Sequence, residues 1–265
     1  MEIWATIVGI AAAVAMAAYL HNRKPAGMGR ALQLGTIAAA AAISAAVTGF
    51  GLKYLTTLDN ASTVEEALQV VREAPLVGLV LKENPEVETR FRRAIEAELK
   101  NPTGNGPQQT FVVGGEVRRD IIVPALRNAD DASALGAIKA MQAFVKYLQG
   151  TDPALCKEFG VIGIRNPSRL SSDGGALFRR SLAAQEDAYL NGRARPAAPQ
   201  KLTDQEVSRL LTEAGFTAAD FEKVVGLAKL SDADGCAIIA KLYAAPMLLP
   251  SPRDGMLARY LLTVS

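Results

Sequence analysis

Histidine and cysteine, on which much enzymatic and metal chemistry depends, are rare in this sequence. The chain contains one histidine, His21, and two cysteines, Cys156 and Cys236. A Ser-His-Asp triad, a Cys-His pair and a histidine-ligated zinc site each need a histidine beside their other residues. No histidine follows residue 21. These three kinds of site are therefore excluded from the long remainder of the chain.

Motifs that bind nucleotides or acylate a serine are also missing. The sequence contains no Walker A motif, no Gly-x-Gly-x-x-Gly motif and no Gly-x-Ser-x-Gly elbow. Asp232 and Asp234, followed by Gly235, look like part of a calcium-binding loop, but that loop would begin at Leu230 and end at Lys241. Because its last position requires an acid, the sequence predicts instead that the aspartates begin a helix. We expect no metal and no cofactor.

Three pairs of neighbouring carboxylates could supply the acid and the base that glycan hydrolysis needs. They are Glu65/Glu66, Asp130/Asp131 and Glu186/Asp187. Glycoside hydrolysis requires two carboxyl groups that flank one bond at a set spacing. Adjacent helix residues point in different directions, and each pair also suits a helix start or a solvated face. We interpret the pairs as structural, with an enzyme acting on an envelope polymer as the alternative.

Arginines are concentrated between residues 165 and 195. The cluster consists of Arg165, Arg169, Arg179, Arg180, Arg193 and Arg195. A solvated surface is the ordinary explanation for such a cluster. It is also the best candidate in this chain for binding an anionic partner, and lipid headgroups would be the nearest anions if the chain is attached to a membrane.

The charges of the chain divide it into two unequal parts. Between residues 1 and 52 only Glu2, Arg23, Lys24 and Arg30 are charged, which accounts for the whole net charge of +2. Subtracting them from the 29 basic and 27 acidic residues leaves 26 of each sign in the rest of the chain. General nucleic-acid binders need a basic excess that displaces counterions from phosphates. The balanced charge argues against that class, and the 49% hydrophobic content excludes a disordered chain.

Two uncharged apolar runs, 3–20 and 31–52, are each long enough to span the hydrocarbon core of a bilayer as a helix. We predict a transmembrane helical hairpin over residues 1–54. A cleavable signal peptide is the alternative for the first run, but Glu2 stands where such a peptide has basic residues. A buried hairpin of a soluble fold is the alternative for the pair, but it would need apolar partners on all sides.

The loop 21–30 between the two runs predicts the orientation of the hairpin. The loop contains Arg23, Lys24 and Arg30, whereas Lys53 alone follows the second run. Because positively charged loops stay in the cytoplasm, we expect the N-terminus and residues 55–265 to lie outside it. The predicted location is the bacterial inner membrane, with the large domain in the periplasm.

Small residues recur at four-residue spacing in both predicted spans. The stripes are Gly9, Ala13 and Ala17 in the first span, and Gly35 and Ala39, or Ala38, Ala42 and Ala46, in the second. Such stripes let helix backbones approach closely. We favour packing of the two spans against each other, and docking onto another membrane subunit is the alternative.

Residues 55–265 carry mostly helical signals. Capping boxes are predicted at 62–65 and 203–206, and Asp131 is predicted to cap a further helix. A short β-hairpin near 110–117 is the one place where strands are plausible, and a single hairpin could not form a sheet. The predicted fold is an all-α, irregular bundle, in one body or in two lobes divided near residue 150 or 195.

Cys156 and Cys236 both fall in this predicted periplasmic domain. Because the periplasm is oxidising and the chain has no other cysteine, we predict a disulfide that joins two helices. Two buried free thiols would be the favoured alternative if the domain were cytoplasmic.

Together these features favour an interaction or structural subunit over an enzyme. We expect the lipid bilayer and another membrane or periplasmic protein as partners, and neither nucleic acid nor nucleotide. The alternatives are the enzyme described above and a helical domain that binds a small ligand. A cleft lined by buried acids would favour the enzyme, whereas a large exposed apolar patch would favour the interaction subunit.

Overall fold

The computed structural model describes residues 63–100, 109–164, 169–194 and 202–263. Within these ranges every regular element is a helix, which confirms the all-α prediction. The predicted transmembrane hairpin, with its loop, lies outside the described residues. Among the helices that the structure describes, none has both the length and the apolar character needed to cross a membrane.

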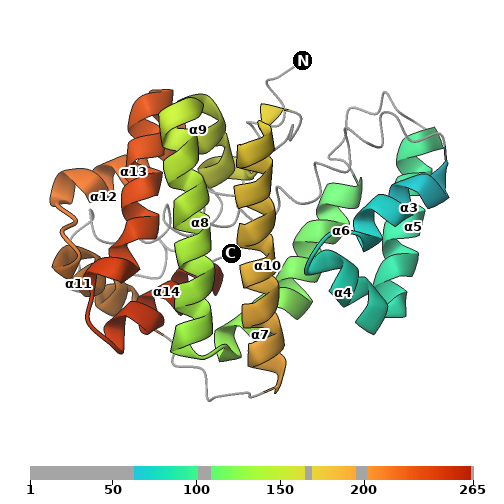
Figure 1. Ribbon diagram of the computed structural model, residues 1–265, viewed down its shortest axis with the longest axis horizontal. Helices are drawn as coiled ribbons and strands as arrows, with labels where there is room; N and C mark the ends of the chain where they lie inside the picture. Colours follow the sequence, from blue (N-terminus) through green and yellow to red (C-terminus); the bar gives the residue numbers. More distant parts are fainter. Residues whose placement is uncertain (1–62, 101–108, 165–168, 195–201, 264–265) are drawn as a thin grey trace, which may run out of the picture.

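Helix α8 (Asp131–Thr151) lies at the centre of the larger group of helices (Figure 1). It packs against α10 (Ser172–Ala194), α13 (Asp232–Ala244), α9 (Pro153–Ile162) and α14 (Arg253–Thr263). The ring of Phe144 in α8 lies 5.1 Å from that of Phe159 in α9 and 5.2 Å from that of Phe178 in α10, measured between ring centres. Burying each such ring contributes on the order of 2 to 3 kcal/mol, so this aromatic cluster holds the three helices together.

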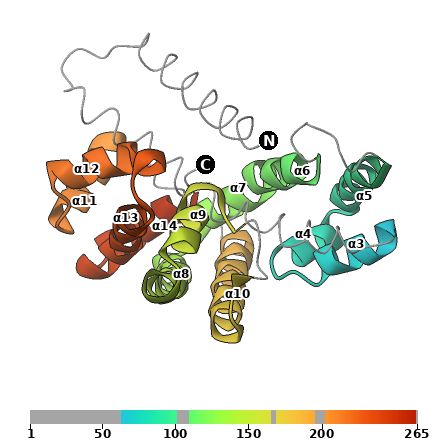
Figure 2. The same cartoon turned by 90° about the horizontal axis from the view of Figure 1, so that it is seen from above.

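A second set of helices, here called the α3–α6 group, lies beside the first (Figure 2). It consists of α3 (Val64–Arg72), α4 (Val77–Glu83), α5 (Pro85–Lys100) and α6 (Gln109–Val117). Helix α6 continues without a break into the π-helical turn η1 (Arg118–Ile122) and then into α7 (Val123–Asn128), which packs against α10 and α14. The chain therefore passes from one group to the other through a single helical segment.

The segment where a β-hairpin was plausible is helix α6. Valines and glycines suggested a strand and a turn, but local preference is weak beside tertiary contacts. Thr110, in the first turn of α6, donates hydrogen bonds from its backbone nitrogen and its hydroxyl to Glu98 of α5, at 2.9 and 2.8 Å. Arg90 of α5 pairs with Glu116 near the other end of α6. Contacts with α5 at both ends therefore stabilise the helical conformation.

The remaining described elements are α11 (Asp204–Glu213), α12 (Ala218–Val225), the short 3-10 turn η3 (Leu227–Lys229) and the turn η4 (Ala245–Leu248) that leads into α14. Helices α11 and α12 lie on the side of α13 that faces away from α8 (Figure 1), where α12 packs against α13 and α11 against α14. One cluster of buried apolar residues runs through all the helical groups. A division into lobes near residue 150 or 195 stays a prediction.

The helix starts follow the sequence signals closely, with two shifts of one residue. The capping box of Thr203 and Glu206 forms as predicted. The first box uses Thr63 and Glu66 rather than the residues at 62 and 65, because the hydroxyl of Thr63 accepts from the backbone of Glu66 at 3.2 Å. Asp130, not Asp131, caps α8. In both cases a neighbouring residue of suitable chemistry takes the cap position.

Asp220 gives the domain a pH-dependent contact between α12 and α13. Partial burial alone would raise the pKa of its carboxyl, but hydrogen bonds from Lys241 and Thr217 outweigh burial and lower the pKa from 3.8 to about 2. The Nζ of Lys241 lies 2.7 Å from the carboxylate. A group whose pKa is lowered by folding stabilises the protein above its unfolded pKa, and loses that contribution as the pH falls toward the folded value.

We therefore expect Asp220→Asn to lower the free energy of unfolding at pH 7 by about 1 to 2 kcal/mol, allowing for solvent screening at Lys241. The difference in unfolding free energy between wild type and variant should roughly halve between pH 6 and pH 3. Over this range the carboxyl binds a proton in the unfolded chain but stays ionised in the folded one, which stabilises the unfolded chain. Urea unfolding at several pH values measures it. A difference that stays constant over this range would show that the carboxylate charge contributes nothing.

Candidate functional site

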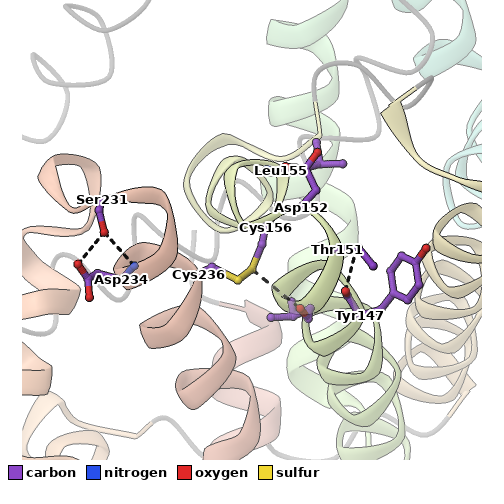
Figure 3. Close-up of a disulfide and its surroundings, with 9 residues drawn as sticks. Tyr147, Thr151, Asp152, Leu155, Cys156, Ser231, Asp234 and Cys236 are labelled. Atoms are coloured by element: carbon purple, nitrogen blue, oxygen red, sulfur yellow. Dashed lines mark hydrogen bonds between the residues drawn. A yellow bond between two sulfur atoms is a disulfide. The ribbon is translucent and has the colours of Figure 1, made fainter.

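The two cysteines meet at one end of the helical bundle, where α9 and α13 lie side by side (Figure 3). Cys156 and Cys236 form a disulfide with a sulfur–sulfur distance of 1.97 Å and a Cα–Cα distance of 5.3 Å. Both residues are fully buried, and the Cys156 sulfur lies 3.9 Å from the carbonyl oxygen of Val145 in α8. The predicted bond between two helices is confirmed. Its burial makes it a structural cross-link rather than an exchangeable redox group.

Side-chain caps position both cysteines near the starts of their helices (Figure 3). The carboxylate of Asp152 accepts a hydrogen bond from the backbone nitrogen of Leu155 at 2.9 Å, which begins α9. The hydroxyl of Ser231 accepts one from the backbone nitrogen of Asp234 at 3.1 Å, which begins α13. The stretch with two aspartates and a glycine is thus the first turn of a helix, as the sequence analysis predicted.

Charged side chains surround this cross-linked end. The Nζ of Lys157 donates to the carbonyl oxygen of Leu230 at 2.6 Å and lies 3.5 Å from the carboxylate of Asp232, so α9 also holds the turn before α13. Arg169, which precedes α10, lies 2.8 Å from Asp152 and 3.2 Å from Glu158. These contacts join α9 to the chain segments on both sides and make the end of the bundle a rigid polar surface.

The structure does not bring the predicted arginine cluster together as one patch. Arg165 and Arg195 lie outside the described residues. Arg169 stands before the start of α10 and is paired with carboxylates, whereas Arg193 is in its last turn and pairs with Glu83 of α4. At 1.5 Å per residue, α10 separates the two by roughly 30 Å or more. The pKa of Arg193 is raised, first by its hydrogen bond with Tyr189 and then by the charge of Glu83.

The other two described arginines of the cluster differ from Arg169 and Arg193 in that they have no carboxylate partner among the described residues. Arg179 and Arg180 are adjacent, exposed and located in the first half of α10. Neither forms an ion pair with any residue that the structure describes. Among the four described members of the predicted cluster, these are the two without an ion pair to another described residue.

The neighbouring carboxylates have structural contacts. Glu65 pairs with Arg72 and Arg92, and its pKa is lowered by the hydrogen bonds from these two arginines. Glu66 is the acid of the Thr63 capping box, and Asp130 caps α8. Asp131 pairs with Arg259, and Glu186 accepts a hydrogen bond from the backbone nitrogen of Leu76. At least one member of each pair thus holds a helix end or an ion pair, and the structural interpretation of the pairs stays a prediction.

Sequence reasoning missed two deeply buried polar residues. Arg118, in η1, is only 3% exposed and donates to the carbonyl oxygen of Leu262 in α14 at 3.3 Å. Burial lowers the pKa of its guanidinium to about 10. Tyr243, in α13, is fully buried, and burial raises the pKa of its hydroxyl. Arg118 has no sequence signal, since it stands beside the exposed Arg119 and Asp120 in an ordinary charged run.

Within the described ranges, no three histidine, cysteine, aspartate or glutamate side chains are grouped so that they could hold a metal ion. Searches of protein-family models, curated proteins and solved structures find no match to this chain.

Proposed function

We propose that this chain is a structural or interaction subunit anchored in the bacterial inner membrane, whose helical domain binds a protein partner in the periplasm. The observation that carries the proposal is the buried disulfide between Cys156 and Cys236. Disulfides persist in oxidising compartments and are rare in the cytosol. The bond is consistent with an extracytoplasmic location of the helical domain.

The apolar runs 3–20 and 31–52 support the anchor, and Arg23, Lys24 and Arg30 between them support a cytoplasmic loop. In this arrangement the chain after the second run lies on the side of the membrane where the disulfide is stable. Two independent features of the chain, the loop charges and the cysteine pair, therefore agree on the compartment.

The exposed arginines of α10 support a partner with an acidic surface. Arg179 and Arg180 stand on a helix held by the aromatic cluster, and no described carboxylate neutralises them. Arginine on a rigid helix binds carboxylates in a bidentate geometry at a small cost in side-chain entropy. We assign these two residues as the contact to the partner.

Purification of the full chain in mild detergent, followed by identification of the chains that co-purify, tests the proposal. We expect a partner with wild type and at least about a tenfold loss of it with Arg179→Glu/Arg180→Glu, because like charges across an interface repel. Lys223→Glu/Lys229→Glu is the matched control, since these lysines are also exposed but lie in and after α12. Absence of a partner with wild type would overturn the function, and equal losses in both variants would overturn the assigned contact.

A further inference from the structure

Helix α4 is joined to α10 by polar contacts at its two ends, here called the seam. The two helices run in the same direction: Leu76, just before α4, contacts Glu186, and Glu83, its last residue, contacts Tyr189 and Arg193. The contacts are thus seven residues apart on each helix. Among the described residues, every side-chain hydrogen bond and ion pair between the α3–α6 group and the other helices belongs to this seam.

The first end of the seam holds a strained backbone. Leu76 has a φ of 53° and a ψ of −55°, and the nitrogen of Val77 donates to the carbonyl oxygen of Pro75 across it, so the three residues form a γ-turn. A positive φ is costly for leucine and persists only where the surroundings impose it. Here the Glu186 carboxylate accepts a hydrogen bond from the Leu76 backbone nitrogen at 2.8 Å, and the Leu76 side chain is fully buried.

The second end of the seam is an exposed ion pair backed by a buried tyrosine. The Tyr189 hydroxyl donates to the Glu83 carboxylate at 3.2 Å, and the Arg193 guanidinium pairs with the same oxygen. The Arg193 guanidinium also lies 5.7 Å from the centre of the Tyr189 ring. Because the Glu83 and Arg193 side chains are 28% and 48% exposed, a competing charged group can reach this end without unfolding the domain.

The α3–α6 group also shares the buried apolar cluster with the other helices, and the chain connects them through the helical segment of α6, η1 and α7. Its second half is fixed, since Arg118 donates to α14 and α7 packs against α10 and α14. Its first half, α6, belongs with α5 through Glu98 and Glu116. The π-helical turn lies where these halves meet. Such turns are frequent at functional sites and are one of the usual causes of a kink in a helix.

We propose that the α3–α6 group is a movable arm that pivots at η1 and is held closed by a latch of Glu83, Glu186, Tyr189 and Arg193. Opening removes the carboxylate that imposes the positive φ of Leu76, so the γ-turn relaxes as the arm leaves α10. The strain at Leu76 favours opening, whereas the two carboxylates of the latch and the shared apolar cluster oppose it. This inference does not depend on the proposed function, because the motion is a property of the chain alone.

Distance measurement between two spin labels on the full chain in detergent tests the arm. Ala97→Cys in α5 and Ala183→Cys in α10 are exposed label positions on either side of the hinge. We expect one narrow distance in the labelled protein and a second, different distance when Glu83→Gln/Glu186→Gln is added. The open population should be at least about tenfold larger with these two substitutions than without them. This is the factor expected for the loss of one charge-assisted hydrogen bond.

The matched control is Glu65→Gln/Glu88→Gln, which removes two carboxylates that pair with Arg72 inside the α3–α6 group. It should leave the label distance unchanged. Hydrogen exchange should show α4 amides at least about tenfold less protected in the latch variant, with α8 and α13 unaffected. An unchanged distance in the latch variant, an equal change in the control, or an equal loss of protection in α8 would each overturn the proposal.

Discussion

Replacing both cysteines by alanine lowers the free energy of unfolding of the helical domain by about 4 to 5 kcal/mol, because the bond between Cys156 and Cys236 closes a loop of 80 positions. In the chain-entropy model, such a cross-link restricts the unfolded chain and stabilises the folded one by comparison. A domain of this size has only about 5 to 15 kcal/mol in total. We therefore expect the melting temperature of the double variant to fall by roughly 10 to 15 °C.

Thiol reductant provides the control for this prediction. Reduction under unfolding conditions should bring wild type close to the double variant and should not affect the variant itself, since the chain has no other cysteine. The same protein also tests the compartment, because mass measurement after alkylation of the denatured, unreduced chain counts its free thiols. Two free thiols in protein isolated from cells would contradict both the bond and the periplasmic assignment. Equal stability of variant and wild type would contradict the energetic argument alone.

Features that depend on a few neighbouring residues could be predicted from the sequence. The capping box at Thr203 follows from a hydroxyl residue and an acid three positions apart, and its geometry is local. The disulfide is a long-range contact, but it was predictable because two cysteines allow one pairing only. In each case the residue types alone leave one favourable arrangement.

Features that depend on packing between distant segments could not be predicted. The short helix α4 begins at a strained Leu76, which Glu186 holds from 110 positions away, and no local signal reveals that contact. Helix α6 has the composition of a strand, but Glu98 and Arg90 of α5 stabilise it as a helix. The arginines appeared as one cluster because they are close in sequence, although the length of α10 separates Arg169 from Arg193.

Changing Gly192 to alanine should lower the free energy of unfolding by about 3 kcal/mol, although alanine is the better helix former. In a helix the exchange of glycine for alanine usually adds about 0.5 to 1 kcal/mol of stability. Gly192 lies where α10 crosses α7, and a Cβ atom there would overlap the carbonyl group of Ala125. The helices cannot separate easily, because the neighbouring Asn191 is bonded to the backbone and the side chain of Asp130 at 2.9 Å each. A backbone collision of this kind costs more than the helix preference returns.

Gly136 is the matched control for this prediction, since it is exposed in the second turn of α8 and a Cβ atom there would meet nothing within 4 Å. Gly136→Ala should therefore stabilise the domain by about 0.5 to 1 kcal/mol, so the two identical exchanges have opposite signs. Urea unfolding followed by pulse proteolysis compares them in the full chain. If both variants are stabilised, α7 and α10 do not approach as closely as described. If only Gly192→Ala lowers the free energy of unfolding, the close crossing of α7 and α10 is needed for stability. This crossing then holds α7, the fixed half of the hinge, against the central helices.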